Sequence, residues 1–309
     1  MIALRAALVA EGGGQKLETE YKIVTTLLGV LRNVDKNNRG RKVKWLGRMV
    51  DSHTMTVSVP EDKLQRIIDL TKHALKEGSL TLLEAQSLAG LLAFCAPAVQ
   101  LGYLFCRRLW TFIASFRKGW PRAYRKRIPA LVREDLEWWN KLFPVYNGVR
   151  FFDDEKREVV HLFTDACGLG LGGFYINGLG SEDCRWQEHV AKIPKSQSYQ
   201  IQSKRDTSQP FDINIEEVTA VLQAVKIWGH AWRGKTLVVY SDNTTTQLGL
   251  VKQSVKSAAN VPLREVLLRA AQMDIRVEPR RVIGEDNGLA DALSRFLQHK
   301  ISNWCPHWQ

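Results

Sequence analysis

The sequence of 309 residues, 45% hydrophobic and 25% charged, is long enough for two cored domains and has the composition of a soluble globular protein. Its apolar runs fall short of the ~20 residues that span a bilayer. Its five scattered cysteines match neither a disulfide framework nor a common zinc finger. We therefore expect a protein that enters no membrane and is not secreted but intracellular, in the nucleus or cytoplasm.

The formal net charge of +12 lies entirely in the first half of the chain. Residues 1–150 contain 25 Lys and Arg against 13 Asp and Glu, whereas residues 151–309 contain 19 against 19. This asymmetry favours a first half that binds a polyanion and a second half with a different task, although a basic surface without a partner has the same composition.

The first half is predicted to be mostly helical after residue 60. Residues 11–42 form a polar segment around a short apolar stretch at 23–31, and the alternation in 43–47 and 55–60 predicts a β-hairpin closed through 51–53. Helices are expected from Pro60 to about residue 75, from Thr81 to about Pro97, and over 101–116. Thr81 followed by Glu84 is the pattern of a capping box.

A strongly basic stretch follows these helices. Six cations interleave with Trp120 and Tyr124: Arg117, Lys118, Arg122, Arg125, Lys126 and Arg127. Basic groups bind phosphates and aromatic rings stack on bases, so the stretch favours nucleic-acid contact over a solvated linker.

The second half changes to strands and helices in alternation. Strands are predicted at 159–163, 170–176, near 185–190, 237–240 and 275–283, with a polar loop over 195–212. Helices are predicted at 216–232, 244–252, 262–273 and from 286 or 287 to 296. This order indicates an α/β fold, a mixed sheet flanked by helices.

Four carboxylates sit at the ends of apolar strands or on amphipathic helices, where a charge is costly without a positive partner. They are Asp165, Glu217, Asp242 and Asp291. Each alone is equally consistent with a helix cap or a solvated acid, but their order along the strands and helices favours a shared site. Two Mg²⁺ or Mn²⁺ ions would be held by these four residues, which would make them the catalytic and metal ligands of a two-metal nuclease.

One run of sequence makes the pattern specific. Residues 282–295, Val-Ile-Gly-Glu-Asp-Asn-Gly-Leu-Ala-Asp-Ala-Leu-Ser-Arg, together with the elements before them, resemble the ribonuclease H domain of retroelement reverse transcriptases. Residues 45–63 and 83–92 resemble the end of the polymerase palm and the following thumb/connection segment. The overall pattern is most similar to DIRS-like (tyrosine-recombinase) retroelements of fungi.

The resemblance implies a palm or linker remnant in 1–42, a thumb/connection-like helical nucleic-acid-binding region in 43–150 and a ribonuclease H-like domain in 151–309. It implies a metal-dependent endonuclease that cleaves the RNA strand of RNA–DNA hybrids. The metal ligands of the family fall on Asp165, Glu217, Asp242 and Asp291, with Glu216 as a neighbouring alternative to Glu217. Candidate contacts to phosphate or the RNA 2′-OH are Ser241, Asn243, Thr244 and Asn287.

Two departures from the family pattern are visible. Many ribonucleases H have a histidine before the last aspartate, but this chain has none between Asp242 and Asp291, so Glu285 is a candidate for proton transfer. The Tyr/Phe-x-Asp-Asp turn of a polymerase should precede Trp45 and does not, and residues 151–154 only imitate it in an acidic linker. DNA synthesis by this chain alone is therefore not expected.

Two other hypotheses stay open. The chain would be a non-catalytic nucleic-acid-binding remnant if turnover were lost, although four intact carboxylates argue against decay. It would be the C-terminal part of a larger reverse transcriptase if a palm were encoded just upstream. The oligomeric state does not follow from the sequence.

Overall fold

The computed structural model describes residues 13–29, 40–141, 143–150, 157–178, 187–203, 211–255 and 257–308. It divides the chain into two compact units, residues 1–102 with 108–154, and residues 103–107 with 155–309. The Phe-Phe-Asp-Asp run at 151–154 lies outside the described residues. Among the helices of the described segments, none is long and apolar enough to cross a membrane.

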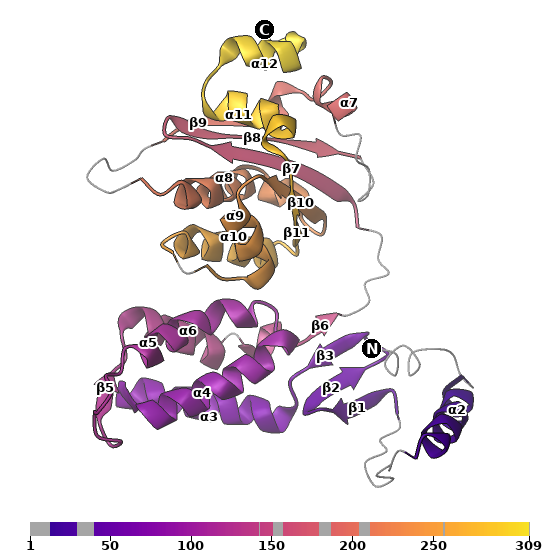
Figure 1. The fold of residues 1–309 in the computed structure, drawn as a ribbon, viewed down its shortest axis with the longest axis vertical. Helices are drawn as coiled ribbons and strands as arrows, with labels where there is room; N and C mark the ends of the chain where they lie inside the picture. The colour runs from indigo at the N-terminus through magenta and orange to yellow at the C-terminus, as the bar shows by residue number, and fades with distance from the viewer. Residues whose placement is uncertain are drawn as a thin grey trace. The chain divides into compact units, whose positions relative to one another are not determined.

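The first unit is mostly helical and also contains a small antiparallel sheet (Figure 1). Its helices are α2 (Gly13–Leu27), α3 (Glu61–Glu77), α4 (Leu82–Cys95), α5 (Arg107–Ala114) and α6 (Ala130–Lys141). Its strands are β1 (Lys42–Trp45), β2 (Arg48–Asp51), β3 (Thr56–Ser58), β6 (Val149–Arg150), and the separate pair β4 (Ser79–Thr81) and β5 (Arg125–Arg127). Strand order in the larger sheet is β1-β2-β3-β6.

Local sequence explains most of these boundaries. The predicted capping box is confirmed, since Glu84 N donates to Thr81 Oγ1 at 3.2 Å and Thr81 N donates to Glu84 Oε2 at 2.8 Å. A hairpin closes after Asp51 as predicted, between β2 and β3, but its first strand is residues 48–51 and not the predicted 43–47. Residues 42–45 form β1, which pairs with β2 through a further turn at 46–47. The helix expected over 101–116 is instead a 3₁₀ turn (Gly102–Phe105) followed by α5, and Leu101, just before the turn, has a left-handed φ of 66°.

The second unit confirms the predicted α/β class, with one mixed five-stranded sheet between two helical layers. The strand order is β11-β10-β7-β8-β9, in which β10 is parallel to both β7 and β11, and the β7–β8 and β8–β9 pairs are antiparallel. The strands are β7 (Val159–Ala166), β8 (Gly170–Asn177), β9 (Ser198–Gln202), β10 (Thr236–Ser241) and β11 (Arg276–Arg281).

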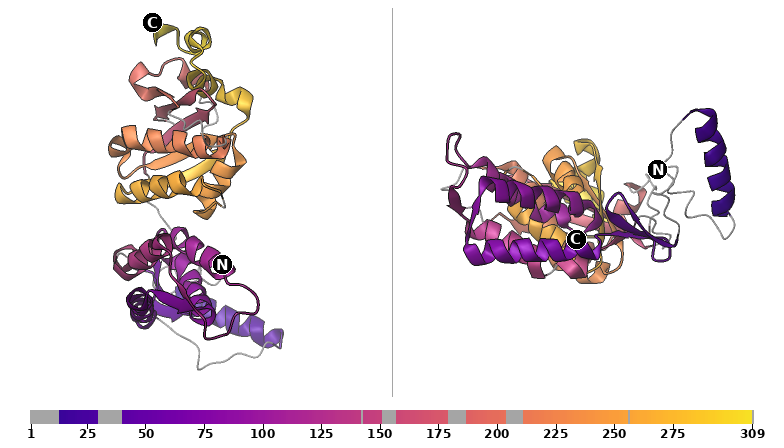
Figure 2. Two further views of the ribbon diagram at one scale, coloured as in Figure 1. Left: turned by 90° about the vertical axis from the view of Figure 1, so that its left-hand side faces the viewer. Right: turned by 90° about the horizontal axis from the view of Figure 1, so that it is seen from below.

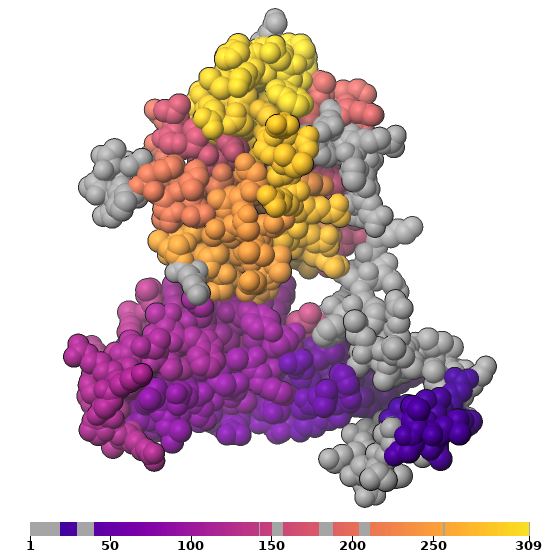
Figure 3. Space-filling view, in the orientation of Figure 1, coloured from indigo at the N-terminus to yellow at the C-terminus, as the bar shows by residue number. Residues whose placement is uncertain are grey.

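Helices cover both faces of this sheet, as Figures 1 and 2 show. On one side lie α8 (Ile213–Trp228) and α10 (Asn260–Gln272), with the short α9 (Thr244–Lys252) beside β11. On the other lie α11 (Gly288–Ser294) and α12 (Gln298–Trp304), and Figure 3 shows part of both at the surface of the unit. The core between α11 and the sheet contains a stack of three rings, in which Phe163 is parallel to Phe174 at 4.8 Å and to Tyr240 at 4.4 Å.

The third strand was predicted in the wrong place. Gln187–Val190, part of the segment expected to be a strand, is the short helix α7, and the strand is β9, inside the segment expected to be a polar loop. Tyr199 explains the difference, because its buried ring packs against Gly173 of β8 and its hydroxyl donates to Ala220 O at 2.6 Å. One aromatic residue in a polar sequence thus secures an edge strand.

Gly172 allows α11 to approach the sheet closely. It pairs with Asp165 across β7 and β8, and a Cβ at this position would lie 2.4 Å from Ser294 N and 2.8 Å from Ala290 O. Both atoms belong to the backbone of α11 and cannot move aside without moving the helix. Gly172 therefore determines how near α11 lies to the strand that ends with Asp165.

We predict that Gly172→Ala lowers the free energy of unfolding by ~1–3 kcal/mol, the usual cost of overpacking a core. Gly168→Ala is the matched control, because nothing lies within 4 Å of a Cβ there. Urea unfolding of both variants and the parent protein measures the effect. Equal stability of the two variants would show that α11 is not held at this distance.

Candidate metal centre

Three of the four predicted carboxylates meet at one edge of the sheet. Asp165 is near the end of β7, Asp242 follows β10, and Glu217 lies in the second turn of α8. One carboxylate oxygen from each lies within 4.8 Å of the other two, the one such group of potential metal ligands in the described parts of the chain. The parallel register explains the meeting, since Tyr240 pairs with Phe163 and an aspartate stands two residues after each of them.

Burial makes this cluster electrostatically unfavourable by itself. Glu217 is only 4% exposed and Asp165 only 7%, while Asp242 is exposed. Desolvation, and then repulsion by Asp165 and Asp242, raises the pKa of Glu217 to about 9. Desolvation also raises the pKa of Asp165 to about 6, against the lowering effect of a hydrogen bond from Ser294 and with further repulsion from Asp242 and Asp291.

The donor set fits a divalent cation of the Mg²⁺ type. All three ligands are carboxylate oxygens, which hard cations prefer. Glu217 Oε2 is buried and has no hydrogen-bond partner among the described residues, although such atoms are normally paired. A cation would offset the repulsion among the three carboxylates and would give Glu217 Oε2 a partner. Asp165, Glu217 and Asp242 are therefore the residues that would hold it.

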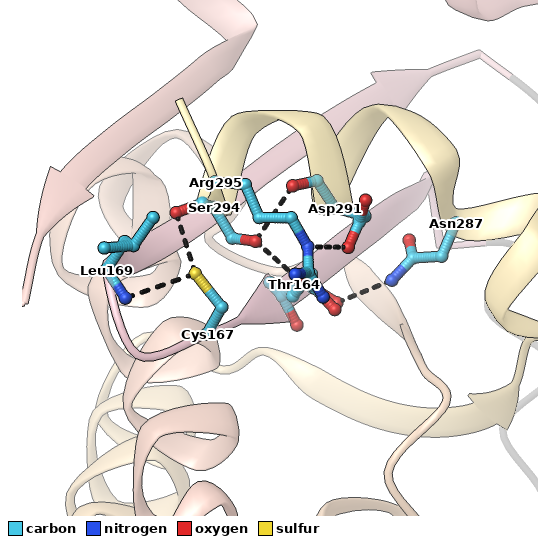
Figure 4. A network of polar contacts seen from close by, with 8 residues as sticks. Thr164, Cys167, Leu169, Asn287, Asp291, Ser294 and Arg295 are labelled. Atoms are coloured by element: carbon cyan, nitrogen blue, oxygen red, sulfur yellow. Dashed lines mark hydrogen bonds and ion pairs between the residues drawn. The ribbon is translucent and has the colours of Figure 1, made fainter. Parts of the chain in front are cut away.

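Asp291 lies beside this cluster but outside the group of three. It is in the first turn of α11, and one of its carboxylate oxygens accepts a hydrogen bond from Arg295 Nε, one turn further on (Figure 4). Its negative charge contributes to the raised pKa of Asp165, which places the two carboxylates within electrostatic reach. Asp291 thus stands near the cluster, paired with a cation of its own helix.

Two polar residues that the sequence did not single out hold the carboxylates in place. Ser294 Oγ, fully buried, donates to Asp165 Oδ2 at 2.5 Å and so ties α11 to β7 (Figure 4). Asn214 Oδ1 accepts from Asn243 Nδ2 at 3.2 Å and ties the start of α8 to the residue after Asp242. Their spacing was a usable signal, since each lies three residues from a predicted ligand on the same helix.

The four predicted substrate contacts differ in what the structure leaves available. Asn287 is buried and its Nδ2 donates to Thr164 O at 2.9 Å, while buried Ser241 accepts from Asn243 N at 3.1 Å. Asn243 Oδ1 caps α9 by accepting from Thr246 N at 2.9 Å. Thr244 is exposed. Substrate contact therefore stays a prediction that fits Thr244 best, because the others already have structural partners.

The basic stretch also divides into two groups. Arg125 donates to Glu84 Oε1 at 3.1 Å and to Ser79 O at 2.9 Å, and Lys126 Nζ donates to Ser115 O at 2.8 Å while lying over the rings of Phe116 and Trp120. These two cations are occupied within the first unit. The remaining four are exposed: Arg117, Lys118, Arg122 and Arg127.

The loop before Asp291 lies close to Asp242. A Cβ on Gly284 would be 3.6 Å from Asp242 Oδ2, and the neighbouring Glu285 is exposed. The candidate for proton transfer is therefore on a segment that borders the cluster, although its own role stays a prediction.

No family model matches the chain, and no curated protein matches it. Among solved structures, a foamy viral protease–reverse transcriptase in complex with an RNA/DNA hybrid matches with a TM-score of 0.38 and 15% identity over 89% of this chain and 34% of that one. The N-terminal ribonuclease H domain of a Mycobacterium tuberculosis protein, fused to maltose-binding protein, matches with a TM-score of 0.34 and 14% identity. That match covers 45% of this chain and 97% of the other. Ribonuclease H1 from Halobacterium salinarum matches with a TM-score of 0.30 and 14% identity, over 47% of this chain and 98% of the other.

The chain spans between 34% and 52% of the foamy viral chains that it matches. At these identities and TM-scores, the matches carry no conclusion about activity. The fold class is established by the five-stranded mixed sheet and its flanking helices.

The raised pKa of Glu217 predicts how stability depends on pH without cations. Folded Glu217 keeps its proton up to about pH 9, whereas its ordinary pKa is 4.5, so the contribution of this residue to stability is most favourable below pH 4.5 and falls as pH rises toward 9. At ~1.4 kcal/mol per pKa unit the total fall is several kcal/mol. Urea unfolding in EDTA from pH 5 to 9 measures this fall in stability, and Glu217→Gln should flatten the curve of stability against pH.

Mg²⁺ should stabilise the parent protein more at pH 8 than at pH 5. Parallel curves for parent and variant would contradict the assignment.

Proposed function

We propose that this chain is a metal-dependent endonuclease that cleaves the RNA strand of RNA–DNA hybrids, derived from a retroelement reverse transcriptase of the DIRS-like type and acting inside the cell. The observation that carries the proposal is the convergence of Asp165, Glu217 and Asp242 within 4.8 Å, with Glu217 Oε2 left without a partner in the described chain. A buried acidic cluster of this kind is costly to keep unless it binds cations. DNA synthesis by this chain alone is not part of the proposal.

The residues of the cluster have different tasks in this proposal. Asp165 and Glu217 are buried and would bind cations on the side that faces the protein core, while exposed Asp242 would bind them on the side that faces solvent and substrate. Bound Mg²⁺ or Mn²⁺ ions would lower the pKa of an attacking water and stabilise the leaving 3′ oxygen. Asp291 would complete the set of four once its pairing with Arg295 is released.

Hybrid binding is assigned to exposed cations of the 43–150 region, the thumb/connection-like part in this proposal. Arg117, Lys118, Arg122 and Arg127 lie on the surface, and exposed Tyr124 packs against Trp120 with ring centroids 4.2 Å apart. Phosphate contacts by such groups supply affinity independent of sequence. The 151–309 region would then contribute the cutting site.

We predict metal-dependent cleavage of a labelled RNA–DNA hybrid in the RNA strand, lost by roughly 10²-fold or more in Asp165→Asn. Glu217→Gln should behave in the same way, whereas the matched control Glu216→Gln should cut normally, because Glu216 is outside the group of three. Gel analysis of the labelled RNA strand, with Mg²⁺, with Mn²⁺ and with EDTA, measures the cleavage by the parent protein and by each variant. Tight binding without cutting by the parent protein would favour a non-catalytic binding module.

The exposed cations predict a change in salt dependence. A variant with Arg117→Gln, Lys118→Gln and Arg122→Gln should bind the hybrid more weakly and lower the slope of log affinity against log salt by about 2–3. Lys126→Gln should change the slope little, since its ammonium is already engaged within the first unit. Fluorescence anisotropy over a salt series measures both. An unchanged slope in the triple variant would remove the stretch from the interface.

A further inference from the structure

We propose that Arg295 changes partner during the reaction: it holds Asp291 in the cation-free protein and contacts the phosphodiester of the substrate when cations take Asp291. This inference rests on the proposed nuclease function and assigns a substrate-binding residue to the same site. Arg295, the residue that directly follows α11, would then have a role in substrate binding.

The position of Arg295 is fixed although its side chain is accessible. It directly follows Ser294, whose buried hydroxyl is bonded to Asp165, so the backbone at this point is tied to the carboxylate cluster. The side chain is 52% exposed and only its Nε is engaged, by Asp291, among the described residues. Figure 4 shows the guanidinium turned back along the helix toward Asp291. Its two outer nitrogens therefore remain available as donors beside the cluster.

The charge balance of the site calls for such a group. Four ionised carboxylates are balanced by two divalent cations, and a phosphodiester then adds one negative charge without a counterpart. A guanidinium presents donors in a planar fork that matches phosphate oxygens, and it stays charged at any physiological pH. Arg295 is the exposed cation bonded directly to one of the four carboxylates. The same arginine that neutralises Asp291 before cations bind can thus neutralise the phosphate afterwards.

A matched pair on another helix separates this role from ordinary helix stabilisation. Arg269 and Glu265 on α10 have the same spacing of four residues, with Nη2 and Oε1 2.9 Å apart, and similarly exposed side chains. Glu265 is not part of the carboxylate cluster. Loss of a helix-surface ion pair is common to both sites, whereas proximity to the cluster is specific to Arg295.

The experiment measures two affinities that should move in opposite directions. Calorimetric titration of Mg²⁺ into the protein without nucleic acid should give a Kd about two- to five-fold lower in Arg295→Gln, the range that release of an exposed ion pair supports. Hybrid binding in Ca²⁺, followed by anisotropy on samples checked for cleavage, should weaken by about tenfold in the same variant. Arg269→Gln should change neither value.

Arg295→Lys keeps the charge but not the planar fork, so its Mg²⁺ affinity should stay near that of the parent while hybrid binding falls. Weaker binding of both Mg²⁺ and hybrid in Arg295→Gln, with circular dichroism unchanged, would overturn the exchange and leave a structural role. Unchanged values would overturn it as well. If the parent protein bound no Mg²⁺ and cut no RNA, the proposed function itself would fail and this inference with it.

Discussion

The structure depends on one electrostatic constraint, the placement of two buried carboxylates and a third exposed one within 4.8 Å at the edge of an apolar sheet. Each carboxylate alone would be tolerable in a polar setting, but together they repel one another, and Asp165 and Glu217 are also shielded from water. The same desolvation and repulsion raise the pKa of Glu217 to about 9 and that of Asp165 to about 6, because the protonated carboxyl avoids the cost of the buried charge. A stable core alone gives no physical reason for this arrangement, whereas the binding of divalent cations, as proposed above, would offset its cost.

The surrounding fold opposes this repulsion through polar links between segments that are far apart in sequence. Ser294 ties α11 to Asp165, Asn287 ties the turn before α11 to Thr164 O, and Asn214 ties α8 to Asn243. Gly172 adds a packing condition, since only a residue without a Cβ lets α11 come this close to β7 and β8. The geometry of the carboxylate cluster is thus set by groups that lie outside it.

Sequence alone predicted that Asp165, Glu217 and Asp242 come together, because Asp165 and Asp242 lie at the ends of apolar strands and Glu217 lies near the start of a strongly periodic helix. It failed for β9, whose residues Ser198–Gln202 are mostly polar and are held by one buried tyrosine and by pairing to β8. The sequence also did not show which side chains pair with one another. The spacing of Asp291 and Arg295 was visible, but that they pair, and that Arg125 and Lys126 bond within their own unit, depends on side-chain placement that no periodicity encodes.

The most direct test of cation binding at this edge of the sheet is the anomalous scattering of Mn²⁺ soaked into crystals of the parent protein. We expect Mn²⁺ bound to carboxylate oxygens of Asp165, Glu217 and Asp242, with Asp291 turned away from Arg295 to join them. Crystals with no Mn²⁺ at this edge of the sheet, at a concentration that saturates ordinary two-metal nucleases, would contradict it. The cluster would then be a protonated structural feature, and the nuclease proposal would lose its basis.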